Sequence, residues 1–476
     1  MVFSSPIFLF LFLPVTLAVY FALPRRWRNP WLLGASLVFY GWGEPKFVAV
    51  MLASIVANFL LALWIDRFPD PRRRRLLLAA AVLANIGLLA TFKYADFVVE
   101  NLNSVLAELH AQPLRLPQIA LPIGISFFTF HALSYVIDVY RRKVPVQRNP
   151  FNIGLYIALF SQLIAGPIIR YHDVAQQLEE RSVTRADFAY GVERFIVGLG
   201  KKVLIANSLA GPADLIFSIP GAQLTLPVAW LGLACYTLQI YFDFSGYSDM
   251  AIGLGRMFGF HFLENFNYPY IAQSMTEFWR RWHISLSNWF RDYLYIPLGG
   301  NRVAPGRVYL NLLIVFFLCG LWHGASWTFV FWGLFHGSFL VSERMGLARR
   351  MAAWRAPLRH AYLVLVVMVS WVFFRSATLS DAGRFLAAMM GMSPASGLEH
   401  PLALYADAQT LLALTIGAIG STPVMPALKR WLERFHAPPI EIGTSSIRLA
   451  AMASILLASA MLLAAGTYNP FIYFRF

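Results

Sequence analysis

Long apolar runs recur along the whole chain, and they constrain its fold more than any other feature of the sequence. Between Val308 and Ser342, for example, there is no Asp, Glu, Lys or Arg. A helix needs about 20 apolar residues to cross a hydrocarbon core, and a spanning segment must satisfy its backbone polar groups internally. Only 13% of the residues are charged, against about 25% in soluble domains. The sequence therefore predicts an all-α polytopic membrane protein.

The spacing of the runs predicts about eleven transmembrane helices in a single membrane domain over residues 1–476. The segment 264–307 is rich in Trp, Tyr, Arg and Asn and too polar to span, so we expect interfacial or re-entrant helices there. The Ala-Gly-Pro sequence at 165–167 is expected to interrupt one run. The expected spans are 5–23, 30–43, 46–65, 75–93, 118–140, 151–168, 226–256, 308–342, 358–376, 408–427 and 446–467.

The net charge of +15 is distributed by loop, which bears on both orientation and partners. Basic residues follow the first, third and fifth runs, whereas the intervening loops carry few. This alternation is typical of the positive-inside rule, and it argues against nucleic-acid binding. We expect a multi-pass protein of a bacterial inner membrane, in contact with lipid, with a periplasmic N-terminus. The basic residues are Arg25, Arg26 and Arg28, then Arg67 and Arg72 to Arg75, then Arg141, Arg142, Lys143 and Arg148.

His323 is the candidate functional residue of the uncharged run. An imidazole is costly to place in an apolar segment, so such groups are functional candidates, and the ring titrates near neutral pH, as general-base chemistry requires. A hydrogen-bonded core histidine is the structural alternative. His336 would face away from His323 on a straight helix, and we interpret it as structural. The histidines show no metal-ligand spacing, so no metal site is expected.

Cys319 offers a second kind of chemistry. It precedes His323 by four residues, so on a helix the two would share a face. That arrangement permits a Cys–His nucleophilic pair. A buried cysteine is more often a small core residue, and both interpretations stay open at this point.

A second histidine, His283, lies in the aromatic segment 277–293. As one continuous helix, this segment would collect its aromatic residues and His283 on one stripe, which is typical of an interfacial helix. Arginines on the other faces could meet lipid phosphates or the phosphates of a nucleotide-bearing donor. The stripe comprises Trp279, Trp282, His283, Leu286, Trp289, Phe290 and Tyr293, and the other faces carry Arg280, Arg281, Ser285, Ser287, Asn288, Arg291 and Asp292.

Two carboxylates, Asp243 and Asp249, lie within an apolar run. A buried carboxylate needs a partner or takes up a proton, so we expect both to pair with an Arg, a His or backbone amides and to support the site. They do not share a helix face, which disfavours a paired-carboxylate mechanism. Gly246, with Gly253 and Gly255, is expected to let helices approach closely.

Several motifs stand together in this chain, and the pair Arg281-Trp282-His283 and Trp322-His323-Gly324 is the most specific of them. With these motifs the chain resembles the membrane-bound O-acyltransferase family, in particular its bacterial alginate O-acetyltransferase branch. The resemblance covers essentially the whole sequence. It rests on Met1–Ser5, Tyr241–Met250, Phe278–Leu286, Tyr295–Arg302, Leu321–Gly324 and Tyr468–Phe471.

The resemblance implies a many-helix fold around a central tunnel, with the family's signature histidine at His323 and the branch's second histidine at His283. It also implies an O-acetyltransferase that uses a cytoplasmic acyl thioester, acetyl-CoA or another, as co-substrate and binds no cofactor. A periplasmic or membrane-tethered acetyltransferase partner would complete the acetylation of an exported polysaccharide such as alginate.

Under this hypothesis His323 is the general base, and His283 orients the donor, stabilises the oxyanion or assists proton transfer. Peptidoglycan and cellulose are alternative acceptors for the same chemistry. Rival hypotheses are an acyl-Cys319 intermediate, a scaffold for a periplasmic enzyme, and a non-enzymatic transporter or export component, where intramembrane polar residues are equally expected. The donor-binding or supporting residues would be Arg280, Arg281, Arg291, Trp282, Asn288, Asp243 and Asp249.

Overall fold

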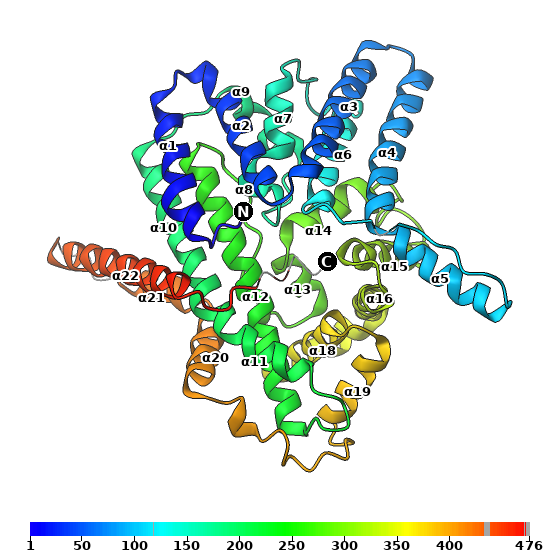
Figure 1. The fold of residues 1–476 in the computed structure, drawn as a ribbon, viewed down its shortest axis with the longest axis vertical. Helices are drawn as coiled ribbons and strands as arrows, with labels where there is room; N and C mark the ends of the chain where they lie inside the picture. Colours follow the sequence, from blue (N-terminus) through cyan, green and yellow to red (C-terminus); the bar gives the residue numbers. More distant parts are fainter. Residues whose placement is uncertain (118, 433–437, 471, 473–476) are drawn as a thin grey trace. The chain divides into compact units, whose positions relative to one another are not determined.

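The computed structural model describes residues 1–117, 119–432, 438–470 and 472, and over these residues it contains helices and no strands (Figure 1). The prediction of an all-α chain is confirmed. In the described part of the chain, five helices are long and apolar enough to cross a membrane, and three shorter apolar helices accompany them. The protein is therefore a multi-pass membrane protein, whereas the number of eleven spans and the central tunnel stay predictions. The five helices are Pro45–Arg67, Pro71–Lys93, Pro305–His323, Ala356–Arg375 and Ser446–Ala464.

The chain divides into two compact units, which we describe separately. The first unit comprises residues 1–192, 251–263 and 324–326. The boundary falls inside α10 and α12, and the single membrane domain over 1–476 stays a prediction. The helices that lie wholly in this unit are α1 (Leu13–Ala22), α2 (Arg25–Gly43), α3 (Val48–Arg67), α4 (Pro71–Lys93), α5 (Ala95–Glu108), α6 (Ile125–Tyr140), α7 (Pro150–Ala158), α8 (Phe160–Leu163) and α9 (Tyr171–Glu179).

The second unit holds residues 193–250, 264–323 and the chain from Trp327 onward, and it contains every residue of the candidate site. The two helices that the boundary divides are α10 (Arg185–Gly200) and α12 (Leu226–Met257). The other helices are α11 (Asn207–Phe217), α13 (Met275–Arg281), α14 (Ile284–Phe290), α15 (Pro305–His323), α16 (Trp327–Ser342), α17 (Ala348–Ala352), α18 (Ala356–Arg375), α19 (Leu379–Met389), α20 (Ala408–Gly420), α21 (Val424–Leu432) and α22 (Pro438–Ala464).

The interruption expected at residues 165–167 is confirmed, because α8 ends at Leu163, and the run 151–168 has a second, unpredicted break at Leu159. Leu159 is extended (φ −54°, ψ 118°) and separates α7 from α8. The amide of Phe160 donates to the Ser36 hydroxyl (3.1 Å) instead of continuing the helix. A side chain that is remote in sequence therefore helps to set the break, which a local Ala-Gly-Pro signal could not reveal.

Glycines set the distances between the helices that carry the site. A Cβ on Gly320 of α15 would lie 2.3 Å from the Phe329 carbonyl oxygen of α16, and one on Gly333 would lie 2.2 Å from the Phe316 carbonyl oxygen. In the same way a Cβ on Gly246 of α12 would lie 2.7 Å from the Gly198 carbonyl oxygen of α10. Small residues permit such backbone approach between apolar helices, so the prediction for Gly246 is confirmed.

Candidate functional site

His283 lies at a break in the chain, and the prediction of one continuous helix over 277–293 is wrong. Helix α13 ends at Arg281, Trp282 is extended, and His283 adopts left-handed angles (φ 44°, ψ 53°) before α14 begins at Ile284. Left-handed backbone costs a non-glycine residue roughly 1–2 kcal/mol. It persists where surrounding contacts impose it, and such residues gather at functional sites.

Asn265 is the residue that imposes the break. Its carbonyl oxygen accepts the Ile284 amide (3.0 Å), and its side-chain Oδ1 accepts both the Ser285 amide (3.2 Å) and the Ser285 hydroxyl (2.9 Å). These bonds satisfy the first amides of α14, which no preceding helical turn could serve. No periodic pattern in the sequence could predict this contact, because Asn265 lies in a loop some twenty residues before the helix.

The same asparagine orients the His283 ring. Nδ1 of His283 lies 3.2 Å from Asn265 Oδ1, and the Ser285 amide, which can only donate, requires that atom to be the oxygen. Oδ1 accepts only, so His283 carries its proton on Nδ1 and the lone pair on Nε2. His283 is fully buried and lies outside the candidate spanning helices, and burial lowers its pKa to about 3. The ring is therefore neutral near pH 7.

Replacing Asn265 by alanine tests this orientation. We expect Asn265→Ala to lose the Nδ1–H preference of His283, measured from the ring ¹⁵N shifts of histidine-labelled protein, and to lower stability by about 1–3 kcal/mol because a buried donor is left unsatisfied. Asn265→Asp keeps the acceptor and should keep the tautomer. Ser248→Ala removes only the bond that Asn265 Nδ2 donates to the Ser248 hydroxyl (3.0 Å) and is the matched control. An unchanged tautomer in Asn265→Ala would contradict the assignment.

His323 is the last residue of α15, and it is enclosed by aromatic rings. Its ring centroid lies 5.0 Å from Trp322, 5.0 Å from Trp332, 5.2 Å from Phe374 and 6.5 Å from His283. The two imidazoles thus approach each other, and the Trp322 ring contacts both, at 6.1 Å from His283. His323 is buried, with 5% of its surface exposed. Of the predicted site residues, the structure brings these two histidines and Trp282 together.

The space beside His323 is almost filled. A cavity of about 10 Å³ opens onto the ring, close to the least space that holds one water. The lining is apolar and aromatic, so water is largely excluded from the ring. Besides His323, the lining residues are Ile240, Phe244, Trp282, Trp332, Trp371, Phe374 and Ile472.

His336 lies on a different helix from His323, so the single straight helix assumed from the sequence is wrong. The run 308–342 turns at residues 324–326 and continues as α16. His336 is fully buried, and its Nδ1 accepts a hydrogen bond from Trp279 Nε1 (3.2 Å). That contact ties α13 to α16.

Glu343 anchors the start of α13, a role that the sequence did not reveal. Its carboxylate accepts the Met275 amide (2.6 Å), the Thr276 amide (3.0 Å) and the Thr276 hydroxyl (2.7 Å). A carboxylate is favourable at a helix N-terminus. Glu343 follows the last residue of α16 directly, so it fixes α13, and with it Trp282, to the helix that follows His323.

Asp243 forms a buried ion pair. Lys202 Nζ lies 2.7 Å from Asp243 Oδ1, and both side chains are almost fully buried. Asp243 Oδ2 also accepts the Ile472 amide (2.9 Å), and the Lys202 ammonium donates to the Pro470 carbonyl. The pair therefore holds the segment that brings Ile472 to the His323 cavity. Neither charge lines that cavity.

Asp249 is part of a second, more exposed charge network. Arg194 Nη2 lies 2.6 Å from Asp249 Oδ1, and Lys201 Nζ lies 2.6 Å from Oδ2. Arg194 also pairs with Glu264 (2.5 Å). The expectation that both buried carboxylates would have partners is confirmed, and Asp249 does not reach the His323 cavity.

The remaining predicted residues lie on a separate pocket or outside both. Arg280 and Arg291 are exposed and line an apolar pocket of about 250 Å³ together with Cys319. Arg281 pairs with Glu277 (2.9 Å) and, like the half-buried Asn288, lines neither the pocket nor the His323 cavity. Cys319 and His323 thus line different spaces, and the donor-binding roles stay predictions.

Comparison with known proteins gives the site a context. The model of the MBOAT, membrane-bound O-acyltransferase family matches residues 114–378, which include both histidines. The chain is 43% identical to a probable alginate O-acetylase of Azotobacter vinelandii over 100% of both chains. It is 47% identical to one from Pseudomonas aeruginosa over 82% of this chain and 75% of that protein. It is 38% identical to a peptidoglycan O-acetyltransferase of Helicobacter pylori over 83% of this chain and 81% of that protein.

Proposed function

Because this chain belongs to the membrane-bound O-acyltransferase family, and is thus an acyltransferase, we propose that it O-acetylates an exported polysaccharide. The observation that carries the proposal is that His323 lines an aromatic, nearly filled cavity and that the His283 ring lies 6.5 Å from the His323 ring. The family membership removes the rival hypotheses of a transporter and of a scaffold without chemistry.

His323 is proposed as the general base. An acceptor hydroxyl gives its proton to His323 as its oxygen attacks the thioester carbonyl carbon. The tetrahedral intermediate then collapses, the carbon–sulfur bond breaks, and His323 returns the proton to the leaving thiolate. The products are an acetyl ester and a free thiol, and no cofactor takes part.

Among the three roles considered for His283, the Asn265 contact favours proton transfer. A neutral ring with its proton on Nδ1 is a hydrogen-bond acceptor at Nε2, so it can accept a hydrogen bond from the proton in transfer, while burial disfavours its full protonation. An oxyanion would need a donor at Nε2, which requires the other tautomer or the cation. His283 is therefore proposed to assist His323 in moving the proton.

The proposed donor is a cytoplasmic acyl thioester, acetyl-CoA in the simplest case. This is consistent with the basic loops, which predict a bacterial inner-membrane protein with a periplasmic N-terminus. The pocket at Arg280 and Arg291, apolar inside and basic at these residues, supports contact with a lipid or with the phosphates of the donor.

Alginate is the proposed acceptor, because alginate O-acetylases match the whole chain. Peptidoglycan is the second candidate, because a protein named as a peptidoglycan O-acetyltransferase matches most of it. A periplasmic or membrane-tethered partner is proposed to complete transfer to the polymer.

The direct test is acetyl transfer by purified full-length protein in liposomes. Labelled acetyl-CoA is added outside the liposomes. A periplasmic acetyltransferase partner is enclosed inside, together with either polymannuronate or peptidoglycan fragments. We expect label on only one of the two polymers. The proposal would be overturned if neither polymer became labelled and no thioester were consumed.

The rival hypothesis of an acyl-Cys319 intermediate is tested by replacing Cys319 with alanine. Because Cys319 and His323 line different spaces, Cys319→Ala is expected to keep transfer within about twofold of wild type. The readout is the same liposome assay, with trapping of acyl-enzyme by acid quench as a second measurement. Loss of both transfer and trapped label in Cys319→Ala would establish the thiol intermediate instead.

A further inference from the structure

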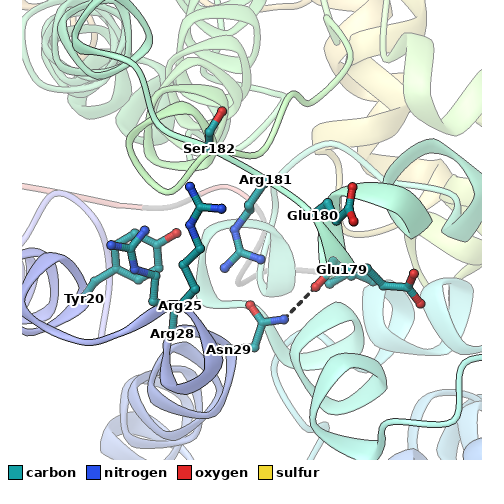
Figure 2. Close-up of a pocket in the computed structure, with 9 residues that line it drawn as sticks. Tyr20, Arg25, Arg28, Asn29, Glu179, Glu180, Arg181 and Ser182 are labelled. Atoms are coloured by element: carbon teal, nitrogen blue, oxygen red, sulfur yellow. Dashed lines mark hydrogen bonds between the residues drawn. The ribbon is translucent and has the colours of Figure 1, made fainter.

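The first unit contains a polar pocket that shares no lining residue with the pocket and cavity described above. It has a volume of about 480 Å³, where one water takes about 30 Å³ in the liquid. Figure 2 shows three arginines and Tyr20 at this pocket, contributed by α1, α2 and the segment that follows α9. The lining residues are Tyr20, Arg25, Arg28, Asn29, Leu178, Glu179, Glu180, Arg181 and Ser182.

Arg181 is held firmly in this pocket. Its Nε donates to the Phe258 carbonyl (2.9 Å) and its Nη1 to the Gln177 carbonyl (3.3 Å). The guanidinium lies 4.2 Å from the ring centroid of Phe260. Its Nη2 is buried and has no hydrogen-bond partner among the described residues. Burial lowers the pKa of Arg181, as expected for a cation that has lost water without gaining an anion.

Two further arginines share the pocket. Arg28 stacks over Tyr20 at 5.0 Å and donates from Nε to the Leu23 carbonyl (3.2 Å). Arg25 is exposed and is the first residue of α2, whose first turn no side chain in the described part of the chain caps. Among the described residues, none of the three arginines forms an ion pair with a carboxylate.

The two glutamates of the pocket do not neutralise this charge. Glu179 Oε1 accepts from Gln147 Nε2 (2.9 Å). In Figure 2 the side chains of Glu179 and Glu180 extend away from the arginines, and Asn29 bonds the Leu178 carbonyl (2.7 Å). The three arginines therefore gather positive charge on one side of the pocket, and no carboxylate in the described part of the chain pairs with them directly.

We propose that this pocket binds a phosphate or diphosphate group. Guanidinium forks match phosphate oxygens and form charge-assisted, bidentate hydrogen bonds. A positive helix terminus beside them favours the same ligand. A bound phosphate would also relieve the mutual repulsion of the three cations.

Two sources of that group are chemically equivalent here. In the topology proposed above, Arg25 and Arg28 face the cytoplasm, where nucleotide-bearing thioesters are found. An anionic phospholipid of the same leaflet presents the same phosphate chemistry. The binding site does not depend on the proposed acetyl transfer, although a thioester source would make it a donor subsite.

The test uses full-length protein and the double variant Arg25→Gln/Arg28→Gln, which spares the packed Arg181. In detergent, binding of inorganic pyrophosphate and of adenosine 3′,5′-bisphosphate is measured by calorimetry. In nanodiscs, retention of phosphatidylglycerol against phosphatidylcholine is measured by native mass spectrometry. Arg26→Gln is the matched control, because Arg26 is an exposed neighbour that does not line the pocket.

We expect the double variant to bind the phosphate compound with an affinity roughly tenfold or more below that of the wild type. Arg26→Gln should keep the wild-type affinity. If the double variant loses affinity only for pyrophosphate and the bisphosphate, the natural ligand is a soluble phosphate compound. If it loses only the retention of phosphatidylglycerol, the natural ligand is a lipid. Equal binding by wild type, the double variant and Arg26→Gln would overturn the proposal. His323→Ala should keep the binding, so failure of the proposed acetyl transfer would be seen separately.

Discussion

Replacing His323 by alanine is expected to lower acetyl transfer by roughly 10²–10⁴-fold, the range that a positioned general base contributes. The physical reason is that the surrounding aromatic rings leave almost no water beside the ring, so solvent cannot substitute for the lost base. The measurement is the rate of label transfer in the liposome assay, with the amount of inserted protein determined for each variant.

Two controls separate a chemical role from a packing role. His323→Gln keeps polar bulk in the cavity but cannot act as a base at neutral pH, so it should be as inactive as His323→Ala while being better folded. His400→Ala removes a half-buried histidine whose Nδ1 bonds the Tyr405 hydroxyl (2.8 Å), away from the cavity lining, and should be fully active. A folded His323→Gln protein with more than half of the wild-type rate would show that His323 is structural.

Replacing Lys202 by methionine is expected to destabilise the protein by roughly 3–5 kcal/mol, because it leaves the buried Asp243 carboxylate without its cation. The loss would also release the contact with the Pro470 carbonyl and loosen the segment that brings Ile472 to the His323 cavity. The readout is the thermal unfolding midpoint of the detergent-solubilised protein, followed by the transfer rate below that midpoint.

The adjacent lysine supplies a matched control. Lys201 is partly exposed, and its partner Asp249 keeps Arg194 when Lys201 is lost, so Lys201→Met should cost no more than about 1 kcal/mol. The double variant Lys202→Met/Asp243→Leu removes both buried charges and should recover much of the stability. Equal midpoints for Lys202→Met and Lys201→Met would contradict the assignment of a buried pair.

Much of the fold could be predicted because a bilayer imposes simple rules on a sequence. Apolar length predicts spanning helices, and the structure has such helices at 48–67, 71–93, 305–323 and 356–375. His323 could be singled out for the same reason, since an ionisable ring in an uncharged run is conspicuous. The family motif at residues 281–283 marked His283 as the second candidate site residue.

Local periodicity failed where contacts remote in sequence override the helix. The segment 277–293 has good helical spacing, yet Asn265 and the left-handed His283 divide it. The run 308–342 looks continuous, yet it turns after His323 and brings Trp332 back against it. Asn265, Lys202 and Glu343 could not be chosen as site residues, because each is an ordinary polar residue until its partner is known.

The sequence by itself determined the membrane class and the helical content, and it singled out two histidines as site candidates, because apolar length and misplaced charge are properties of single segments. Only the tertiary structure decided which ring nitrogen of His283 faces the Asn265 acceptor, which carboxylate pairs with Lys202, and which arginines share a pocket without pairing with a carboxylate. These depend on distances between residues far apart in the chain. Hydrogen bonds and ion pairs act over a few ångströms, so their consequences appear only once the helices are packed.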